Sequence, residues 1–178
     1  MMDTPNLPLT PYASDKLAGE HYLNVHRRAH SLEPIIFRFF NIFAPRQEPS
    51  SPYSGVISIF SERAQKDLPI TIFGDGEQTR DFIYVEDLVK LLAQGIETSL
   101  FTPGAVNIGL NQATTLNQTL QTTSKILNKQ PTAHFQPARA GDIRHSRADN
   151  SRLLQRFIFS DTTPMSVEIS KPLSTQTN

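Results

Sequence analysis

Apolar side chains recur along this chain with two spacings, and segments with one spacing alternate with segments with the other. A spacing of three to four residues predicts helices near 11–30, 54–66, 87–96, 116–128 and 149–156. Short apolar runs predict strands near 34–40, 70–73, 105–109 and 132–136, with 78–85 partly extended. This alternation favours an α/β fold. Three prolines predict a long loop over 44–53, and we expect the polar residues 160–178 to be irregular and mobile.

The first strand and the first helix carry the most specific patterns. Pro34–Phe40 is almost continuously apolar, which is typical of a strand buried on both faces of a parallel sheet. Asn41 follows it directly. We therefore expect the Asn41 side chain to be exposed at the strand's carboxyl end, where open α/β sheets place their ligand crevice. The helix at 11–30 carries an apolar stripe that includes Tyr22 and Val25.

Charge and composition narrow the function classes. Seventeen basic and seventeen acidic side chains cancel, which disfavours a nucleic-acid surface or a polybasic membrane patch. Cysteine is absent, so disulfides and thiolate metal sites are excluded. His26 and His30 lie four apart without a carboxylate on the same face, and we interpret them as part of a solvated helix face rather than a metal site. The sequence has no long apolar run and no segment like a signal peptide, so we predict a cytoplasmic protein.

Tyr12 and Lys16 form the candidate catalytic pair. Thr10 suits the N-cap of a helix and Pro11 its first position, so a spacing of four places the phenol and the ammonium on one helical face. A close cation favours the phenolate, which makes a tyrosine usable as a base near neutral pH. A lysine four residues after a tyrosine also arises readily by chance, so the pair needs support from other motifs.

Four segments supply that support. They are PYASDKLAGE at 11–20, RFFNIFAPRQ at 38–47, FGDGEQTRDFIYVEDL at 73–88, and ARAGDI at 138–143 with Ala148-Asp149. In this order they resemble the later half of an extended short-chain dehydrogenase/reductase of the NAD-dependent epimerase/dehydratase family, and most closely the UDP-glucose and UDP-N-acetylglucosamine 4-epimerases. The resemblance implies a partial Rossmann-type parallel sheet, with its late strands and helices only, and a small C-terminal substrate-binding α/β region.

The resemblance also implies a division of the chain. Residues 1–50 would be the C-terminal remnant of the NAD-binding Rossmann domain. Residues 51–160 would mostly form the nucleotide-sugar binding region, with 69–109 partly returning to the Rossmann sheet. Residues 161–178 would be the irregular tail.

Catalytic and cofactor roles follow from the same resemblance. Tyr12 would remove the proton from the 4-hydroxyl of the sugar. Lys16 would bind the nicotinamide ribose of NAD and assist ionisation of the phenol. NAD would accept a hydride from the sugar and return it to the other face of the 4-keto sugar, so that the cofactor is not consumed. Phe40 would lie with these two residues at the cofactor.

Six residues would bind the UDP-sugar. Asn41 would hydrogen-bond near the phosphates, although it could instead only cap its strand. Arg80 and Arg139 would bind phosphate, because a planar fork of donors fits phosphate oxygens. The full set implied by the resemblance is Asn41, Val56 in the uracil pocket, Arg80, Phe82 close to the nucleotide, Arg139, and Asp142 as acceptor of a ribose hydroxyl.

Several of these residues have a structural alternative. Arg80 could form a surface ion pair with its neighbour Asp81, which would contribute little. Arg139 and Asp142 could pair with each other across a turn. Phe82 is equally well explained as a core residue.

The family's NAD-phosphate site has no counterpart in this sequence. That site is a glycine-rich turn between a strand and a helix, whose free amides meet the pyrophosphate. We therefore expect an N-terminally truncated chain that binds NAD poorly and has little or no epimerase activity alone. A non-catalytic remnant that binds nucleotide sugars and a nucleotide-sugar 4,6-dehydratase stay open as alternatives. The implied partners are a UDP-sugar and, in the full-length form, a second copy in a homodimer, with no nucleic acid and no membrane.

Overall fold

Helices and strands alternate along the chain in the computed structural model, which describes residues 6–44, 47, 55–98 and 104–170. The first half contains α1 (Pro11–His30), β1 (Phe37–Phe39), β2 (Asn41–Phe43), α2 (Val56–Gln65), β3 (Ile70–Phe73), β4 (Thr79–Arg80), β5 (Phe82–Tyr84) and α3 (Val85–Glu97). The second half contains β6 (Val106–Ile108), β7 (Thr114–Thr115), α4 (Leu116–Leu127), β8 (Ala133–Gln136), α5 (Ser151–Arg156) and α6 (Ser166–Ile169). The predicted α/β fold is confirmed.

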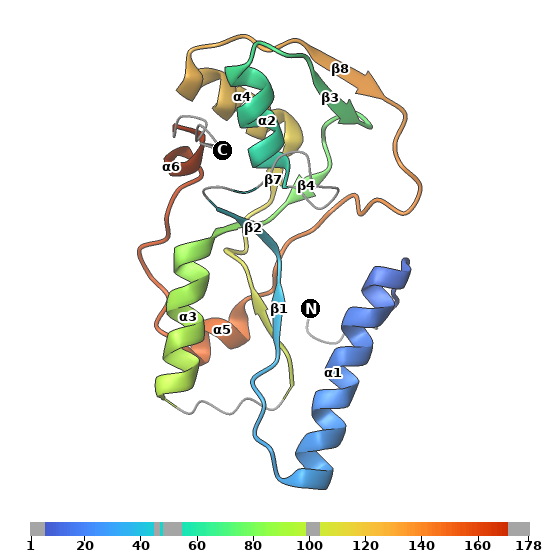
Figure 1. Cartoon of the computed structure of the whole chain (residues 1–178), viewed down its shortest axis with the longest axis vertical. Helices are drawn as coiled ribbons and strands as arrows, with labels where there is room; N and C mark the ends of the chain where they lie inside the picture. The colour runs from blue at the N-terminus through green and yellow to red at the C-terminus, as the bar shows by residue number, and fades with distance from the viewer. Residues whose placement is uncertain (1–5, 45–46, 48–54, 99–103, 171–178) are drawn as a thin grey trace, which may run out of the picture.

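Short parallel strand pairs organise the molecule. β1 pairs with β6, β2 with β5 and β3 with β8, each in parallel, while β4 and β7 are antiparallel. Figure 1 shows α3 and α5 beside the β1–β6 pair at one end, and α2, α4 and α6 grouped with β3 and β8 at the other. Parallel strands connected through helices are the parts of a Rossmann-type sheet.

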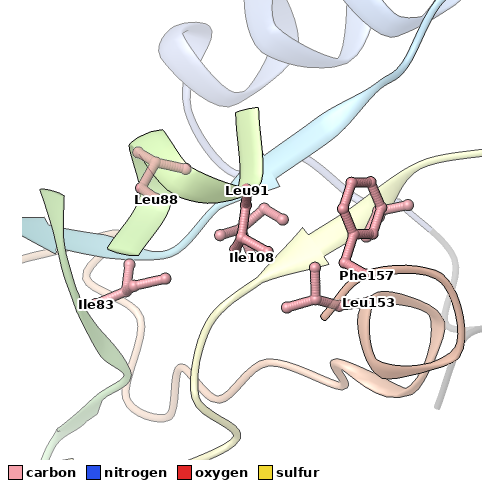
Figure 2. Packing of buried hydrophobic residues seen from close by; sticks show 7 residues of the cluster. Ile83, Leu88, Leu91, Ile108, Leu153 and Phe157 are labelled. Atoms are coloured by element: carbon pink, nitrogen blue, oxygen red, sulfur yellow. The ribbon is translucent and has the colours of Figure 1, made fainter. Parts of the chain in front are cut away.

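One hydrophobic cluster packs α3 and α5 against β6. Leu88 and Leu91 lie three residues apart and therefore share one face of α3. They point toward Ile108 of β6, and Leu153 and Phe157 close the cluster from α5 and its C-cap (Figure 2). None of these five side chains is more than 5% exposed. Two further clusters contain Phe43, Ile57, Phe82, Tyr84 and Ile169, and Phe60, Ala64, Ile70, Ile72 and Leu116.

α1 has its predicted bounds but lies outside this core. Thr10 caps it, since its Oγ1 accepts a backbone N–H of the first turn at 3.2 Å. No residue of α1 is buried, and the predicted apolar stripe is exposed, with Tyr22 at 68% and Val25 at 59%. Glu20 connects α1 to β1 by accepting from Nε and Nη2 of Arg38 at 2.6 and 2.7 Å, and this hydrogen bonding raises the pKa of the arginine.

The first apolar run is a shorter and more exposed strand than predicted. β1 covers three residues, and Asn41 opens β2 instead of ending β1. Ile36 is 5% exposed, but Phe39 is 49% exposed. Within the described residues β1 has a sheet neighbour on one side only, β6. The prediction of a strand buried on both faces and followed by an exposed Asn41 is therefore wrong, because Asn41 is half-buried and pairs in register with Phe82.

Capping residues set the starts of two further helices. α4 starts after Thr115, whose hydroxyl accepts the N–H of Gln118 while the Gln118 side chain accepts the N–H of Thr115. α2 starts after Gly55, and its predicted first residue, 54, lies outside the described residues. The loop predicted over 44–53 also lies mostly outside them. No helix in the described part has the length and apolar character that crossing a membrane requires.

The tail contains a short helix that the sequence pattern did not predict. Ile169 of α6 is fully buried and packs in the cluster that contains Phe43. The carboxylate of Asp87 holds the preceding segment, since it accepts the N–H of Thr163 at 2.6 Å. The expectation of an irregular tail is therefore wrong for 166–169, while 171–178 lie outside the described residues.

Candidate functional site

A cavity of about 570 Å³ lies between α2, β3, β4, the start of α4 and the loop that follows β8. Four of the six residues predicted to bind the nucleotide sugar line it, although they come from three distant segments. Val56 lies in the first turn of α2 and Arg80 in β4, and Arg139 and Asp142 lie in the loop after β8. Apolar side chains from α2 and α4 complete one wall, so the cavity combines an apolar side with a cationic one.

Arg80 is the most strongly held cation of this cavity. Its Nη2 donates to Oδ1 of Asp142 at 2.7 Å, and its Nη1 donates to the carbonyls of Ile143 at 2.7 Å and Thr79 at 2.8 Å. The alternative pairing with Asp81 does not form. That carboxylate is fully buried and accepts backbone N–H groups elsewhere. Three acceptors therefore hold the Arg80 guanidinium, and two of them lie in the loop after β8.

Arg139 faces an aromatic ring instead of Asp142. Its guanidinium carbon lies 3.6 Å from the centroid of Phe73, a cation–π contact at the end of β3. A turn joins Arg139 to Asp142, because the N–H of Asp142 donates to the Arg139 carbonyl at 3.2 Å. Gly141 lies within this turn at φ +79°, a backbone conformation that favours glycine. The alternative side-chain pairing of Arg139 with Asp142 is therefore not what the structure contains.

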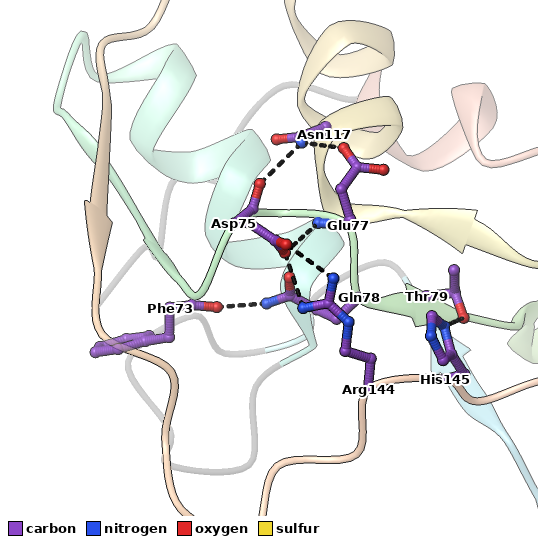
Figure 3. A network of polar contacts seen from close by, with 8 residues as sticks. All are labelled: Phe73, Asp75, Glu77, Gln78, Thr79, Asn117, Arg144 and His145. Carbon is purple, nitrogen blue, oxygen red and sulfur yellow. Dashed lines mark hydrogen bonds and ion pairs between the residues drawn. The ribbon is translucent and has the colours of Figure 1, made fainter.

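An ion pair fixes the loop after β8 to the turn after β3 (Figure 3). Arg144 donates to both carboxylate oxygens of Asp75, at 3.1 and 2.8 Å. Hydrogen bonding from Arg144, and then from the N–H of Glu77, lowers the pKa of Asp75 to about 2. Asn117 at the start of α4 donates to the carbonyl of Asp75 at 3.1 Å and to the Glu77 carboxylate, so the turn is also tied to that helix.

Backbone hydrogen bonds next to Arg80 also attach the loop after β8 to β4. The N–H of Thr79 donates to the carbonyl of Arg144 at 2.8 Å, and the N–H of Ser146 donates to the Thr79 carbonyl at 3.2 Å. Gln78 is 5% exposed, contributes to the cavity wall, and donates from Nε2 to the Phe73 carbonyl. Sequence reasoning missed Asp75, Gln78 and Arg144 as supports of the site; the only available signal was the glycine-flanked Asp75, which marks a turn.

Asn41 and Phe82 lie away from the lining of the cavity. They are register partners on β2 and β5, and the N–H of Asn41 donates to the carbonyl of Asp81 at 2.9 Å. Phe82 is 7% exposed and belongs to a core cluster with Phe43. It also borders a second, smaller cavity of about 230 Å³ on the side of Thr163. The structure therefore agrees with the alternative in which Phe82 is a core residue.

Tyr12 and Lys16 lie on one face of α1, as their spacing predicted. The Nζ of Lys16 is 5.2 Å from the centroid of the Tyr12 ring, which is 63% exposed. The end of α1 that carries Tyr12 lies near the loop after β8 (Figure 1), and the methyl of Thr10 is 3.9 Å from where a side chain on Gly141 would begin. Phe40, the third predicted cofactor residue, is half-buried between β1 and β2 and donates its N–H to the Ile108 carbonyl at 3.1 Å.

The fold is α/β with short parallel strand pairs, and comparison with known proteins identifies its family. The model of the NAD dependent epimerase/dehydratase family matches residues 2–109. The chain is 34% identical over 84% of its length to a UDP-glucose 4-epimerase of Mycolicibacterium smegmatis, and 35% identical over 78% to a putative UDP-glucose 4-epimerase of Methanocaldococcus jannaschii. It belongs to the NAD dependent epimerase/dehydratase family.

Solved structures give the same result. A UDP-N-acetylglucosamine 4-epimerase from Methanobrevibacter ruminantium matches 92% of this chain with a TM-score of 0.84 and 33% identity. A UDP-glucuronic acid 4-epimerase from Bacillus cereus, crystallised with NAD and a fluorinated UDP-sugar, matches 96% with a TM-score of 0.86 and 28% identity. These matches cover 52% and 53% of the two solved chains, and 47% and 44% of the two relatives above. The chain therefore spans about half the length of the proteins it matches.

The described residues contain candidates for one end of NAD. Tyr12 and Lys16 share an exposed helix face and are the candidates for the nicotinamide ribose. The phosphates of a dinucleotide require free amides of a glycine-rich turn between a strand and a helix. In the described residues β5 runs directly into α3 and β7 directly into α4, with no glycine at either junction. Tyr12, Lys16 and Phe40 are thus the residues of this chain that are candidates to meet the cofactor.

Proposed function

We propose that this chain supplies the nucleotide-sugar cavity and the catalytic tyrosine of a UDP-sugar 4-epimerase, and that the isolated chain binds the nucleotide sugar without converting it. One observation carries the proposal. Val56, Arg80, Arg139 and Asp142, drawn from three segments up to 86 residues apart, line the same cavity, and the helix with Tyr12 begins beside it.

The cavity offers each part of a uridine diphosphate a matching partner. Arg80 and Arg139 provide two planar guanidinium groups for the diphosphate. Asp142 is an acceptor for a ribose hydroxyl, and its side chain is 37% exposed. Val56, at the start of α2, borders the space assigned to the uracil ring. Asn41 of β2 and Phe82 of β5 lie outside the lining of this cavity, and Phe82 supports β5 from the core.

Tyr12 acts as the base on the sugar 4-hydroxyl. Its ring is exposed, so the phenol oxygen is accessible to a substrate in the neighbouring cavity. Lys16 keeps a positive charge near the ring, with its Nζ 5.2 Å from the ring centroid. Tyr12 and Lys16 would hold the nicotinamide ribose, and NAD, when bound, would supply the acceptor and donor of the hydride. Tyr12 holds and returns the proton, and the cavity keeps the UDP portion fixed.

The epimerase assignment is preferred to the dehydratase alternative. The chain matches UDP-glucose 4-epimerases at 34–35% identity, while a dTDP-glucose 4,6-dehydratase of Neisseria gonorrhoeae matches at 29% over 71% of the chain. The candidate substrates are the sugar nucleotides in the names of the matching 4-epimerases, namely UDP-glucose, UDP-glucuronate and UDP-N-acetylglucosamine.

Calorimetric titration of UDP-glucose into the purified chain tests the binding part. We expect wild type to bind, and R80Q and R139Q to bind at least about tenfold more weakly, since each loses a charge-assisted contact. The matched control is R147Q, which removes an exposed arginine that bonds Asn111 outside the cavity. Equal affinities for R80Q, R147Q and wild type would contradict the assigned cavity.

An activity assay with UDP-galactose and added NAD tests the catalytic part. We expect no turnover by the isolated chain. Turnover that Y12F abolishes would support the assignment of Tyr12 and overturn the proposal that the isolated chain is inactive. Turnover that survives Y12F would overturn the role of Tyr12.

A further inference from the structure

The carboxylate of Asp142 pairs with the guanidinium of Arg80, to which the proposed function assigns the diphosphate. The Arg80 side chain is 14% exposed and that of Asp142 is 37% exposed, so the pair lies at the cavity wall with the carboxylate on the open side. The Nη2 of Arg80 donates to Asp142 at 2.7 Å. An anionic ligand that binds Arg80 through this Nη2 hydrogen must therefore displace a carboxylate of the protein itself.

The surroundings allow Asp142 to leave without detaching its loop. Gly141 precedes it at φ +79°, and Arg144 follows it, held by both oxygens of Asp75 and by the N–H of Thr79. The loop is therefore fixed two residues after Asp142 and has a glycine directly before it. Moving the carboxylate away from Arg80 breaks one ion pair and leaves these anchors intact.

Arg80 remains aimed at the cavity when Asp142 leaves. Its Nη1 donates to two backbone carbonyls, of Thr79 and Ile143, which hold the plane of the guanidinium. Nη2 has a second hydrogen, and Nε donates no hydrogen bond to any of the described residues. Nε and Nη2 together form the edge of a guanidinium that binds two oxygens of one phosphate.

We propose that Asp142 competes with anionic ligands for Arg80, and so lowers the affinity of the cavity for phosphate groups until one of them displaces the carboxylate. The proposal rests on the proposed function and concerns the same cavity. A neutral or singly charged group gains little by exchanging itself for a carboxylate. A diphosphate presents more charge and several oxygens to Arg80 and Arg139 together, so it gains more than the displaced ion pair contributed. The displaced carboxylate is then free to accept a ribose hydroxyl.

Inorganic pyrophosphate and orthophosphate are the probes, because they test the exchange without ribose or base. Their affinities are measured by calorimetry at constant ionic strength for wild type, D142N, R80Q and the double variant. The control is D67N, which removes the same charge and the ion pair with Lys129 at an exposed position outside the cavity. Asp67 has φ +54°, which asparagine tolerates.

We expect D142N to bind pyrophosphate about fivefold more tightly than wild type, the upper range for a partly exposed ion pair. Orthophosphate should gain by a similar factor, because it displaces the same carboxylate. Neither gain should appear in D67N. In the R80Q background D142N should have no effect, since the carboxylate then has no guanidinium to occupy.

Several results would overturn the proposal. One is an unchanged pyrophosphate affinity in D142N, which would make the ion pair a permanent support of the loop. Another is an equal gain in the R80Q background, which would show a general charge effect. Failure of either anion to bind wild type and D142N would show that Arg80 is no anion site.

Uridine separates this proposal from the proposed function. D142A should weaken the binding of uridine, because the ribose acceptor is lost. Uridine lacks phosphate, so R80Q should not change its binding. Uridine that binds neither wild type nor D142A, together with the expected pyrophosphate result, would contradict the nucleotide cavity and still support the exchange at Arg80.

Discussion

Asp81 accepts a hydrogen bond of 2.9 Å from the backbone N–H of Ala148, and this contact joins the strand region of Arg80 to the end of the loop that carries Asp142. The same fully buried carboxylate accepts the N–H of Leu110 at 2.9 Å. One side chain therefore holds three separated segments next to the cavity. Arg80 can face Asp142 because its neighbour Asp81 fixes where the loop returns.

Removing the charge of Asp81 should destabilise the protein. D81N keeps the shape of the side chain but directs an N–H at one of the two backbone donors, which leaves a buried donor unsatisfied. We expect the free energy of unfolding to fall by about 2 kcal/mol, measured by urea denaturation. D161N, at an exposed position, should change it by less than about 0.5 kcal/mol. Equal stabilities for the two variants would contradict the role of Asp81.

The ion pair of Asp75 and Arg144 should make stability depend on pH in the acid range. The pKa of Asp75 is lowered from 3.8 to about 2, so the pair's stabilising contribution is complete above about pH 4 and is lost as the pH falls toward 2. The difference in unfolding free energy between wild type and R144Q should shrink over this range.

Side-chain NMR titration checks the cause. In R144Q the pKa of Asp75 should rise back toward 3.8, because the largest lowering contact is gone. The pKa of Asp149 is lowered by hydrogen bonds from Ser151 and should not respond to R144Q, which makes it an internal control. A pKa of Asp75 that stays near 2 in R144Q would show that the turn alone lowers it.

Two glycine-to-alanine substitutions should have opposite signs. Gly76 has φ +79°, and a Cβ there would lie 2.2 Å from Oδ1 of Asn117. G76A should therefore lower the unfolding free energy by more than about 1 kcal/mol. Gly19 lies within α1 with nothing within 4 Å of a Cβ, so G19A should raise it by about 0.5–1 kcal/mol. Thermal unfolding of both variants gives the comparison, and a stabilising G76A would contradict the geometry of the turn.

Ile169 should contribute far more to stability than its place in a polar tail suggests. It is fully buried beside Phe43 and Ile57, so I169A should lower the unfolding free energy by about 3 kcal/mol. V167A, two residues earlier in the same helix and 37% exposed, should cost less than about 1 kcal/mol. Equal small effects in urea denaturation would mean that α6 does not dock on the core.

The sequence by itself determined the features whose causes are local. Thr10 and Pro11 set the start of α1, and Thr115 with Gln118 sets the start of α4, because capping depends on residues within one turn. The alternation of spacing predicted the α/β fold, and four ordered motifs predicted the family. Arg80, Arg139 and Asp142 lie within those motifs, and the resemblance also implied Val56.

Tertiary structure alone decided which residues meet. Arg80 pairs with Asp142, 62 residues away, and not with its neighbour Asp81, because the buried carboxylate of Asp81 accepts backbone donors from two other segments. β7 consists of two residues that pair with β4, and Ile169 is buried by contacts with β2 and α2. No local pattern encodes such partners, since each depends on the path of a distant segment. Apolar spacing likewise predicted a face on α1, but Tyr22 and Val25 of that face are exposed, because burial depends on the elements packed around the helix.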